Sequence, residues 1–168
     1  MTKLTEPMLS ELREEAGVTK RVLDRVPADK LSWRPHPKSM SLGQLALHVA
    51  TIPGGLSTLA KLDEFDVANA NFNPPEAKDL AELHAAFEQS IRAAEDCLSG
   101  MSDQAAMGNW RLMSRGQEAF SMPRVVMLRS IMLNHWYHHR GQLTVYLRLL
   151  DVPVPVIYGR SADEDPFA

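Results

Sequence analysis

Apolar side chains recur at steps of three and four residues in four separate stretches of this chain. That repeat is typical of an amphipathic α-helix, whose apolar stripe must be covered by another element. Four such helices cover one another most simply in a bundle, so the sequence predicts an all-α fold, a four-helix bundle. The four expected helices are residues 6–26, 41–62, 79–101 and 121–150.

Cap and breaker residues set the expected ends of these helices. Either Ser39 or Ser41 can cap the second helix. Ser121 and Pro123 suit the cap and first turn of the fourth. The Pro-Gly-Gly segment at 53–55 interrupts the second stripe and predicts a kink in that helix.

Three connectors join the expected helices. Residues 27–40 and 63–78 are rich in proline and polar side chains and are expected to be loops. In residues 102–121 the helical period fails, and both a short hairpin and an extended crossing loop fit the pattern. We expect a single domain over residues 1–168, in which residues 151–168 form a C-terminal tail.

Charge and composition exclude several classes of protein. The 18 basic and 21 acidic residues are mixed along the chain and form no basic stripe, so the sequence predicts no nucleic-acid partner. No apolar run is long enough to cross a bilayer, and the polar start predicts no signal peptide. Cys97 is the single cysteine, which excludes an internal disulfide and predicts a cytoplasmic protein with a buried, inert thiol.

Histidines stand inside two of the apolar stripes. His135 and His139 are four residues apart, so on a helix both rings leave the same face. His48 lies on the stripe of the second helix. Each buried ring needs a polar partner. We expect His36 to be a surface loop residue and His84 to flank its stripe, so neither joins this set.

A divalent metal would satisfy His48, His135 and His139 together. Three neutral nitrogen ligands suit zinc or nickel better than calcium or magnesium. They also leave a position for water or substrate, which is typical of a catalytic metal site. The alternative is that the three rings are hydrogen-bonded core histidines and hold no metal.

Other polar residues of the fourth helix are candidates for supporting roles. Gln142 continues the line of ligands and can bond to bound water or to a ligand ring. Tyr146 is either a proton donor or a tyrosine at the core edge. Arg140 either binds an anion or forms a surface salt bridge. His138 points about 100° away from His139, so it is expected to lie outside the metal face.

The sequence resembles the DinB family, the damage-inducible-type four-helix bundles. The resemblance rests on His-His-Arg-Gly-Gln-Leu at 138–143 with His135 upstream. Leu-Ser-Trp-Arg-Pro at 31–35, Ser-Met-Ser-Leu-Gly-Gln-Leu at 39–45 and His48 match a second element of the family. It covers the first, second and fourth helices well and the third weakly.

The resemblance implies an up-up-down-down bundle with a long crossover, often a homodimer. It also implies zinc or nickel held by His48, His135 and His139. Some relatives are thiol S-transferases or isomerases that use bacillithiol or mycothiol. Mycothiol-dependent relatives can carry glutamate at the position of His135, so this chain is more similar to the bacillithiol-transferase branch.

Three functions fit these observations. The first is a metal-dependent thiol S-transferase or hydrolase acting on a small molecule. The expected partners include a low-molecular-weight thiol, and Gln142, Tyr146 or Arg140 would orient the substrate. The second is a stress-response protein that holds metal or a small ligand without turnover, because no general base can be named. The third is a metal-free structural bundle, dimeric, with hydrogen-bonded histidines.

Overall fold

A computed structural model describes residues 2–71 and 73–167, so residues 1, 72 and 168 of the expected domain lie outside the described part. Most of the described chain is helical, as predicted. None of its helices is both long and apolar enough to cross a membrane. The helices are α1 Glu6–Leu23, α2 Leu42–Ala60, α3 Leu80–Gly100, α4 Asp103–Met107, α5 Arg124–Met127, the π-helical η3 Leu128–Leu133, and α6 Asn134–Leu149, with short 3-10 turns η1 Ala28–Lys30 and η2 Val67–Asn69.

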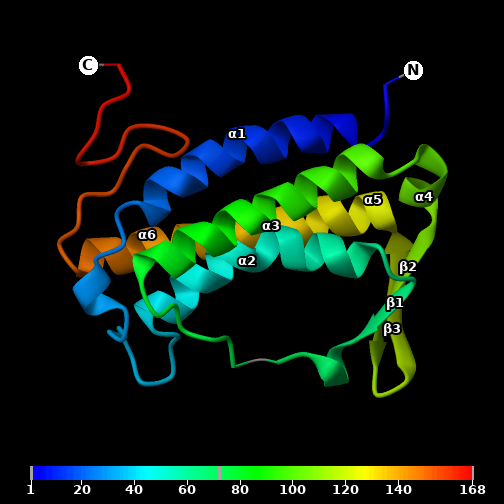
Figure 1. The fold of residues 1–168 in the computed structure, drawn as a ribbon, viewed down its shortest axis with the longest axis horizontal. Coiled ribbons are helices and arrows are strands. Elements are labelled where there is room, and N and C mark those ends of the chain that lie inside the picture. The colour runs from blue at the N-terminus through cyan, green and yellow to red at the C-terminus, as the bar shows by residue number, and fades with distance from the viewer. Residues whose placement is uncertain (1, 72, 168) are drawn as a thin grey trace.

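The long helices pack lengthwise, and their directions correct the predicted up-up-down-down order. Helices α1 and α5–α6 run one way, whereas α2 and α3 run the other (Figure 1). The connector after α1 turns the chain straight back. The connector between α2 and α3 then crosses the length of the molecule, which makes α3 parallel to α2. The long crossover is therefore present, but it joins two parallel helices.

Helix α2 lies at the centre and is buried on most of its surface. Ser41, one of the two expected caps, closes a capping box with Gln44. Helix α2 continues through Pro53 to Ala60, so the Pro-Gly-Gly segment does not end it. Close packing against α3 explains the glycine at position 54. A Cβ there would lie 2.7 Å from Ser90 Cα of α3, so only glycine lets the two helices approach this closely.

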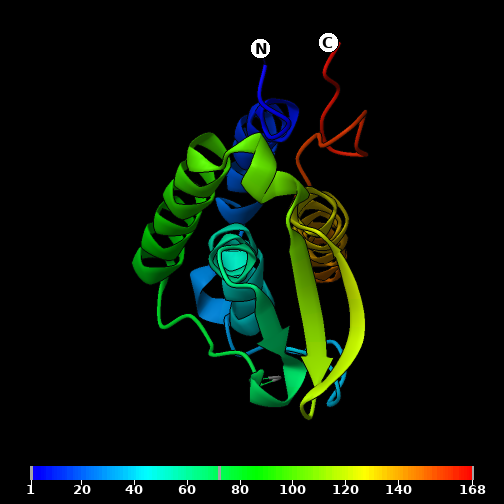
Figure 2. The ribbon, with the colours of Figure 1, turned by 90° about the vertical axis from the view of Figure 1, so that its right-hand side faces the viewer.

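A small sheet closes one end of the molecule, so the all-α prediction needs correction (Figures 1 and 2). Strands β2 Asn109–Ser114 and β3 Gln117–Pro123 form an antiparallel hairpin, one of the two structures expected for residues 102–121. Its turn uses Gly116 at φ 78°. Strand β1 Glu64–Asp66 pairs parallel to β2. Three residues are too few to show a strand period, which is why this segment was expected to be a loop.

The expected fourth helix is interrupted by the π-helical segment η3. A π turn contains about one residue more than an α turn, so it shifts the phase of everything that follows. Within it, Leu128 and Met132 are buried. After it, the buried line moves on by one residue and consists of Trp136, Arg140, Leu143 and Leu147. The predicted line through the histidines therefore flanks the core instead of occupying its centre.

Candidate metal centre

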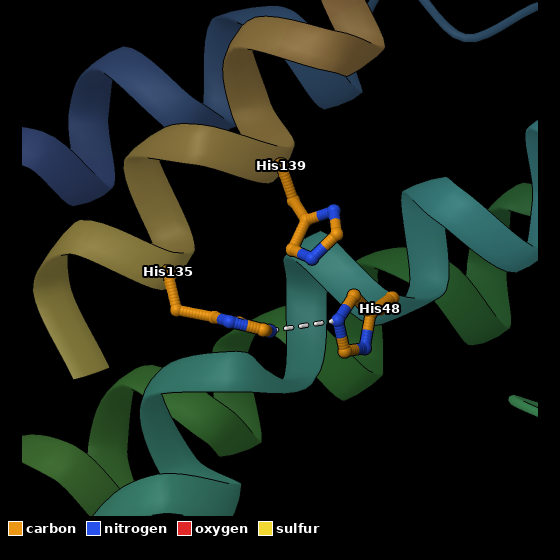
Figure 3. A group of neighbouring side chains, drawn as sticks. All are labelled: His48, His135 and His139. Carbon is orange, nitrogen blue, oxygen red and sulfur yellow. Dashed lines mark hydrogen bonds between the residues drawn. The ribbon is translucent and has the colours of Figure 1, made fainter. Parts of the chain in front are cut away.

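Three histidine rings converge between α2 and α6 (Figure 3). His48 comes from α2, and His135 and His139 come from successive turns of α6. The Nε2 atoms of His48 and His135 lie 3.1 Å apart. One ring nitrogen from each of the three residues lies within 4.8 Å of the others. The structure thus brings together the three residues that the sequence singled out as metal ligands.

The packing of α2 against α6 holds the rings in this register. Trp136 is fully buried beside His135, and its indole Nε1 donates a hydrogen bond to the carbonyl of Val49, 3.0 Å away. This bond ties the residue after His135 to the residue after His48. Because buried indole nitrogens need an acceptor, the bond resists sliding of one helix along the other.

The surroundings keep all three imidazoles neutral at physiological pH. Burial lowers the pKa of His48 to about 4, with added repulsion from His139 and His135. Burial also lowers the pKa of His135 and of His139, and their histidine neighbours act in the same direction. Neutral imidazole is the form that binds metal, so no proton competes for the site at neutral pH.

Gln142 selects the tautomer of His139. Its Oε1 atom lies 2.7 Å from Nδ1 of the ring. An amide oxygen can only accept, so Nδ1 carries the proton and Nε2 keeps its lone pair. A partner on the second ring nitrogen is a common feature of histidines that ligate metals.

The donor set fits a borderline divalent metal. Among the residues that the structure describes, His48, His135 and His139 are the potential metal ligands whose donor atoms lie close enough together to share one ion. All are neutral nitrogen donors, and no carboxylate belongs to the group, which favours zinc or nickel over magnesium or calcium. Each residue is only half-buried, so solvent or a small molecule can reach the site. The cluster could therefore hold a metal ion with an open position.

A cavity of about 450 Å³ begins at the histidines. We call it the histidine cavity. Its lining contains no aspartate, glutamate, lysine, arginine or tyrosine. The lining residues are His48, Thr51, Ile52, Gly55, Leu56, Leu59, Ile131 and His135. Its volume falls within the range of roughly 300–1,000 Å³ that is usual for small-molecule sites.

Neither Tyr146 nor His138 lines the histidine cavity. The Tyr146 hydroxyl donates to the carbonyl of Met40 at 3.2 Å, and its ring packs edge-on against Trp33. The expected core-edge position of Tyr146 matches this contact. His138 is exposed and lies outside the ligand cluster, although its ring centroid is 4.9 Å from that of His139.

Arg140 is neither at the cavity nor at the surface, which corrects the expected surface salt bridge. It is 1% exposed and turns toward α1. Its guanidinium donates to Glu15 Oε2 at 2.5 Å and to the Thr19 hydroxyl at 3.1 Å, and it also contacts the hydroxyl of Tyr158 in the C-terminal tail. It therefore braces the side of α6 opposite the ligands.

Sequence reasoning missed the residues that form the cavity walls. Thr51 and Gly55 stand one and two turns after His48 on α2, and Ile131 stands one turn before His135. Helical spacing from a ligand could have identified these positions. Glu15 was also missed, because its partner Arg140 is 125 residues away in the chain.

Comparison with known proteins places the chain among a set of related helical proteins. A model of the DinB family matches residues 1–165. The Bacillus subtilis protein "Uncharacterized protein YrdA" is 26% identical over 165 residues, 98% of this chain and 93% of that protein.

Two crystal structures of DinB-like proteins share the fold. One, from Bacillus cereus, has a TM-score of 0.70 at 23% identity and covers 91% of this chain and 97% of that chain. The other, YjoA from Bacillus subtilis, has a TM-score of 0.69 at 18% identity and covers 92% of this chain and 99% of that chain.

Proposed function

The chain belongs to the DinB family, and we propose that it is a divalent-metal-dependent enzyme, a thiol S-transferase or a hydrolase, acting on a small molecule. The observation that carries this proposal is that two members of the ligand cluster, His48 and His135, also line a cavity of about 450 Å³. A molecule in that cavity would lie directly beside the ion. Zinc and nickel are the metals that the three nitrogen donors fit best.

Each residue of the site has a separate task in this proposal. His48, His135 and His139 hold the ion, which when bound acts as a Lewis acid and lowers the pKa of a thiol or a water molecule. Gln142 keeps the proton of His139 on Nδ1. The apolar walls of the histidine cavity bind the apolar part of the substrate and exclude water from it.

The chemistry of the lining favours the thiol transferase over the hydrolase. Apart from the two histidines, no side chain in the histidine cavity can accept a proton at neutral pH. A thiol has a pKa of about 8.5, so it ionises near neutral pH with little help from a protein base. Free water has a far higher pKa, so hydrolysis would depend entirely on the metal to ionise the nucleophile.

A matched pair of variants tests the proposal. Protein stripped with a chelator is reloaded with one equivalent of zinc or nickel and assayed with small thiols and apolar electrophiles. We expect turnover in the loaded wild type and in His138→Asn, and a loss of at least about 100-fold in His135→Asn, as removal of a metal ligand predicts. Equal turnover in both variants would refute metal-dependent catalysis. Tight metal binding without turnover of any pair would instead indicate a binding or stress-response protein.

A further inference from the structure

A second hollow adjoins the histidine cavity, on the surface between α2 and α3. This second hollow, which we call the polar groove, has a volume of about 270 Å³. Its lining residues are Thr51, Gly54, Gly55, Thr58, Ala86, Gln89, Ser90 and Ala93. Thr51 and Gly55 line both hollows, so the boundary between them lies over this one turn of α2.

Gly55 places no side chain between the two hollows. It is exposed, and a Cβ added to it would meet nothing within 4 Å. Packing therefore does not require glycine here, in contrast to Gly54, where a Cβ would lie 2.7 Å from Ser90. Glycine in a helix interior weakens the helix relative to alanine. Gly55 therefore leaves open a space at the junction of the two hollows that a larger side chain would fill.

The linings of both hollows define what can occupy them. Neither contains an aspartate, glutamate, lysine or arginine. The hydroxyls of Thr51 and Thr58 donate to the carbonyls of Leu47 and Gly54, both at 2.8 Å, so toward a ligand they can only accept. Beyond the reach of a bound ion, a charged group would lose its hydration there and gain no opposite charge. The two hollows suit an uncharged, largely apolar molecule that carries N–H or O–H groups.

We propose that Gly55 is the specificity-determining position of this site and that the molecule bound there is uncharged, with an apolar body beside His48 and His135 and an extension across Gly55 into the polar groove. The inference rests on the proposed function, because it identifies which reactant enters the cavity. In the transferase reaction that reactant is the apolar electrophile. A charged thiol would approach the histidines from the solvent side.

Two fluorescent dyes that differ by a single charged group test the charge. N-phenyl-1-naphthylamine is neutral, and 8-anilinonaphthalene-1-sulfonate is the same framework with a sulfonate. Both are titrated into chelator-treated protein at pH 7.5 and about 0.15 M salt, where long-range charge effects are screened. We expect the neutral dye to bind at least tenfold more tightly. Equal or tighter binding of the sulfonate, or no saturable binding of the neutral dye, would overturn the proposal.

A graded series tests the position. Gly55→Ala and Gly55→Leu put progressively larger side chains over the junction, and both favour helix, so folding should be retained. We expect Gly55→Leu to weaken the neutral dye at least tenfold and Gly55→Ala to weaken it less. Gly17→Leu is the matched control, because Gly17 is also an exposed helical glycine with nothing within 4 Å of an added Cβ. Unchanged dye binding in Gly55→Leu would overturn the assignment.

Metal binding separates this inference from the proposed function. Gly55 contributes no ligand atom, so Gly55→Leu should take up zinc as the wild type does. A wild type that binds the neutral dye but no metal would refute the metal-dependent function and leave the role of Gly55 standing. A wild type that binds metal but no neutral dye would refute the role of Gly55 alone.

Discussion

The Oε1 atom of Gln142 lies 2.7 Å from Nδ1 of His139, one turn further along α6. This contact holds the proton on Nδ1 and leaves Nε2 free for the cluster. Gln142 is itself exposed and is not a member of the ligand group. In the proposed metal site its role is to position a ligand, and it can be removed without removing a donor atom.

Gln142→Leu should weaken zinc affinity by about 10–100-fold, as is usual when the hydrogen-bond partner of a ligating histidine is lost. The same change at Gln104, an exposed glutamine on α4, should leave the affinity unaltered. Competition with a chromophoric chelator measures both. If Gln142→Leu and Gln104→Leu bind zinc equally well, Gln142 does not position the ring.

Zinc or nickel should stabilise the folded protein, because the unfolded chain has no assembled site. At a free metal concentration of about 100 times the Kd, the gain is about 2.7 kcal/mol, which for a domain of this size raises Tm by roughly 5–10 °C. His135→Asn should lose this shift, and His138→Asn should keep it. Thermal unfolding followed by circular dichroism distinguishes them, and equal shifts in the two variants would contradict the assigned ligands.

The metal-free protein should lose stability as the pH falls from about 7 toward 4. The pKa of His48 is lowered to about 4 in the folded state, and the pKa values of His135 and His139 are also lowered. On acidification the unfolded chain therefore takes up protons first, which favours unfolding. Urea titrations at several pH values, with chelator present, should show a shallower pH dependence in His48→Leu. Identical slopes for wild type and variant would show that burial does not lower the pKa of His48.

Arg140 should be far more important for stability than an exposed arginine. Its side chain is 2% exposed and that of its partner Glu15 is 13% exposed. Arg140→Met would leave the carboxylate of Glu15 buried without its partner, which costs about 3–5 kcal/mol. Arg13, in an exposed pair with Glu95, is the control, and Arg13→Met should cost about 1 kcal/mol or less.

Urea unfolding measures both changes. The double variant Arg140→Met/Glu15→Leu should recover much of the loss, because it removes the unpaired carboxylate as well. If Arg140→Met costs no more than Arg13→Met, the buried pair does not brace α6 against α1.

Local sequence patterns were sufficient to predict most of the helices. Helices α1, α2 and α3 begin within a few residues of the predicted positions, because each has a regular apolar period and a recognisable start. Ser41, one of the two expected caps, accepts a backbone hydrogen bond at the start of α2, and Asp79 does the same at the start of α3. The direction of the helices was not predictable from these local signals, since it depends on which connector crosses the molecule.

The remaining features depend on contacts between distant segments. The π turn at Leu128–Leu133 adds a residue to the helical repeat, and an apolar sequence shows no sign of it. Leu149, the last residue of α6, is consequently 58% exposed. Arginine is ordinarily a surface residue, so the burial of Arg140 could not be expected without knowledge of Glu15 on another helix.

The three histidines could be grouped before their geometry was known because each was costly alone in an apolar stripe. The cavity could not be predicted from the sequence, because its walls come from separate turns of α2 and from Ile131 of η3. Residues such as Thr51 and Gly55 carry no signal of function in isolation. Only their positions relative to His48 identify them as cavity residues.

The metal content of the protein tests the central claim most directly. The chain is purified without a nickel column and without a histidine tag, and its zinc and nickel are measured by elemental analysis before and after titration with each metal. We expect about one equivalent per chain in the wild type and loss of it in His48→Asn, because the site needs all three donors. A wild type that holds less than about a tenth of an equivalent and takes up no metal on titration would contradict the account.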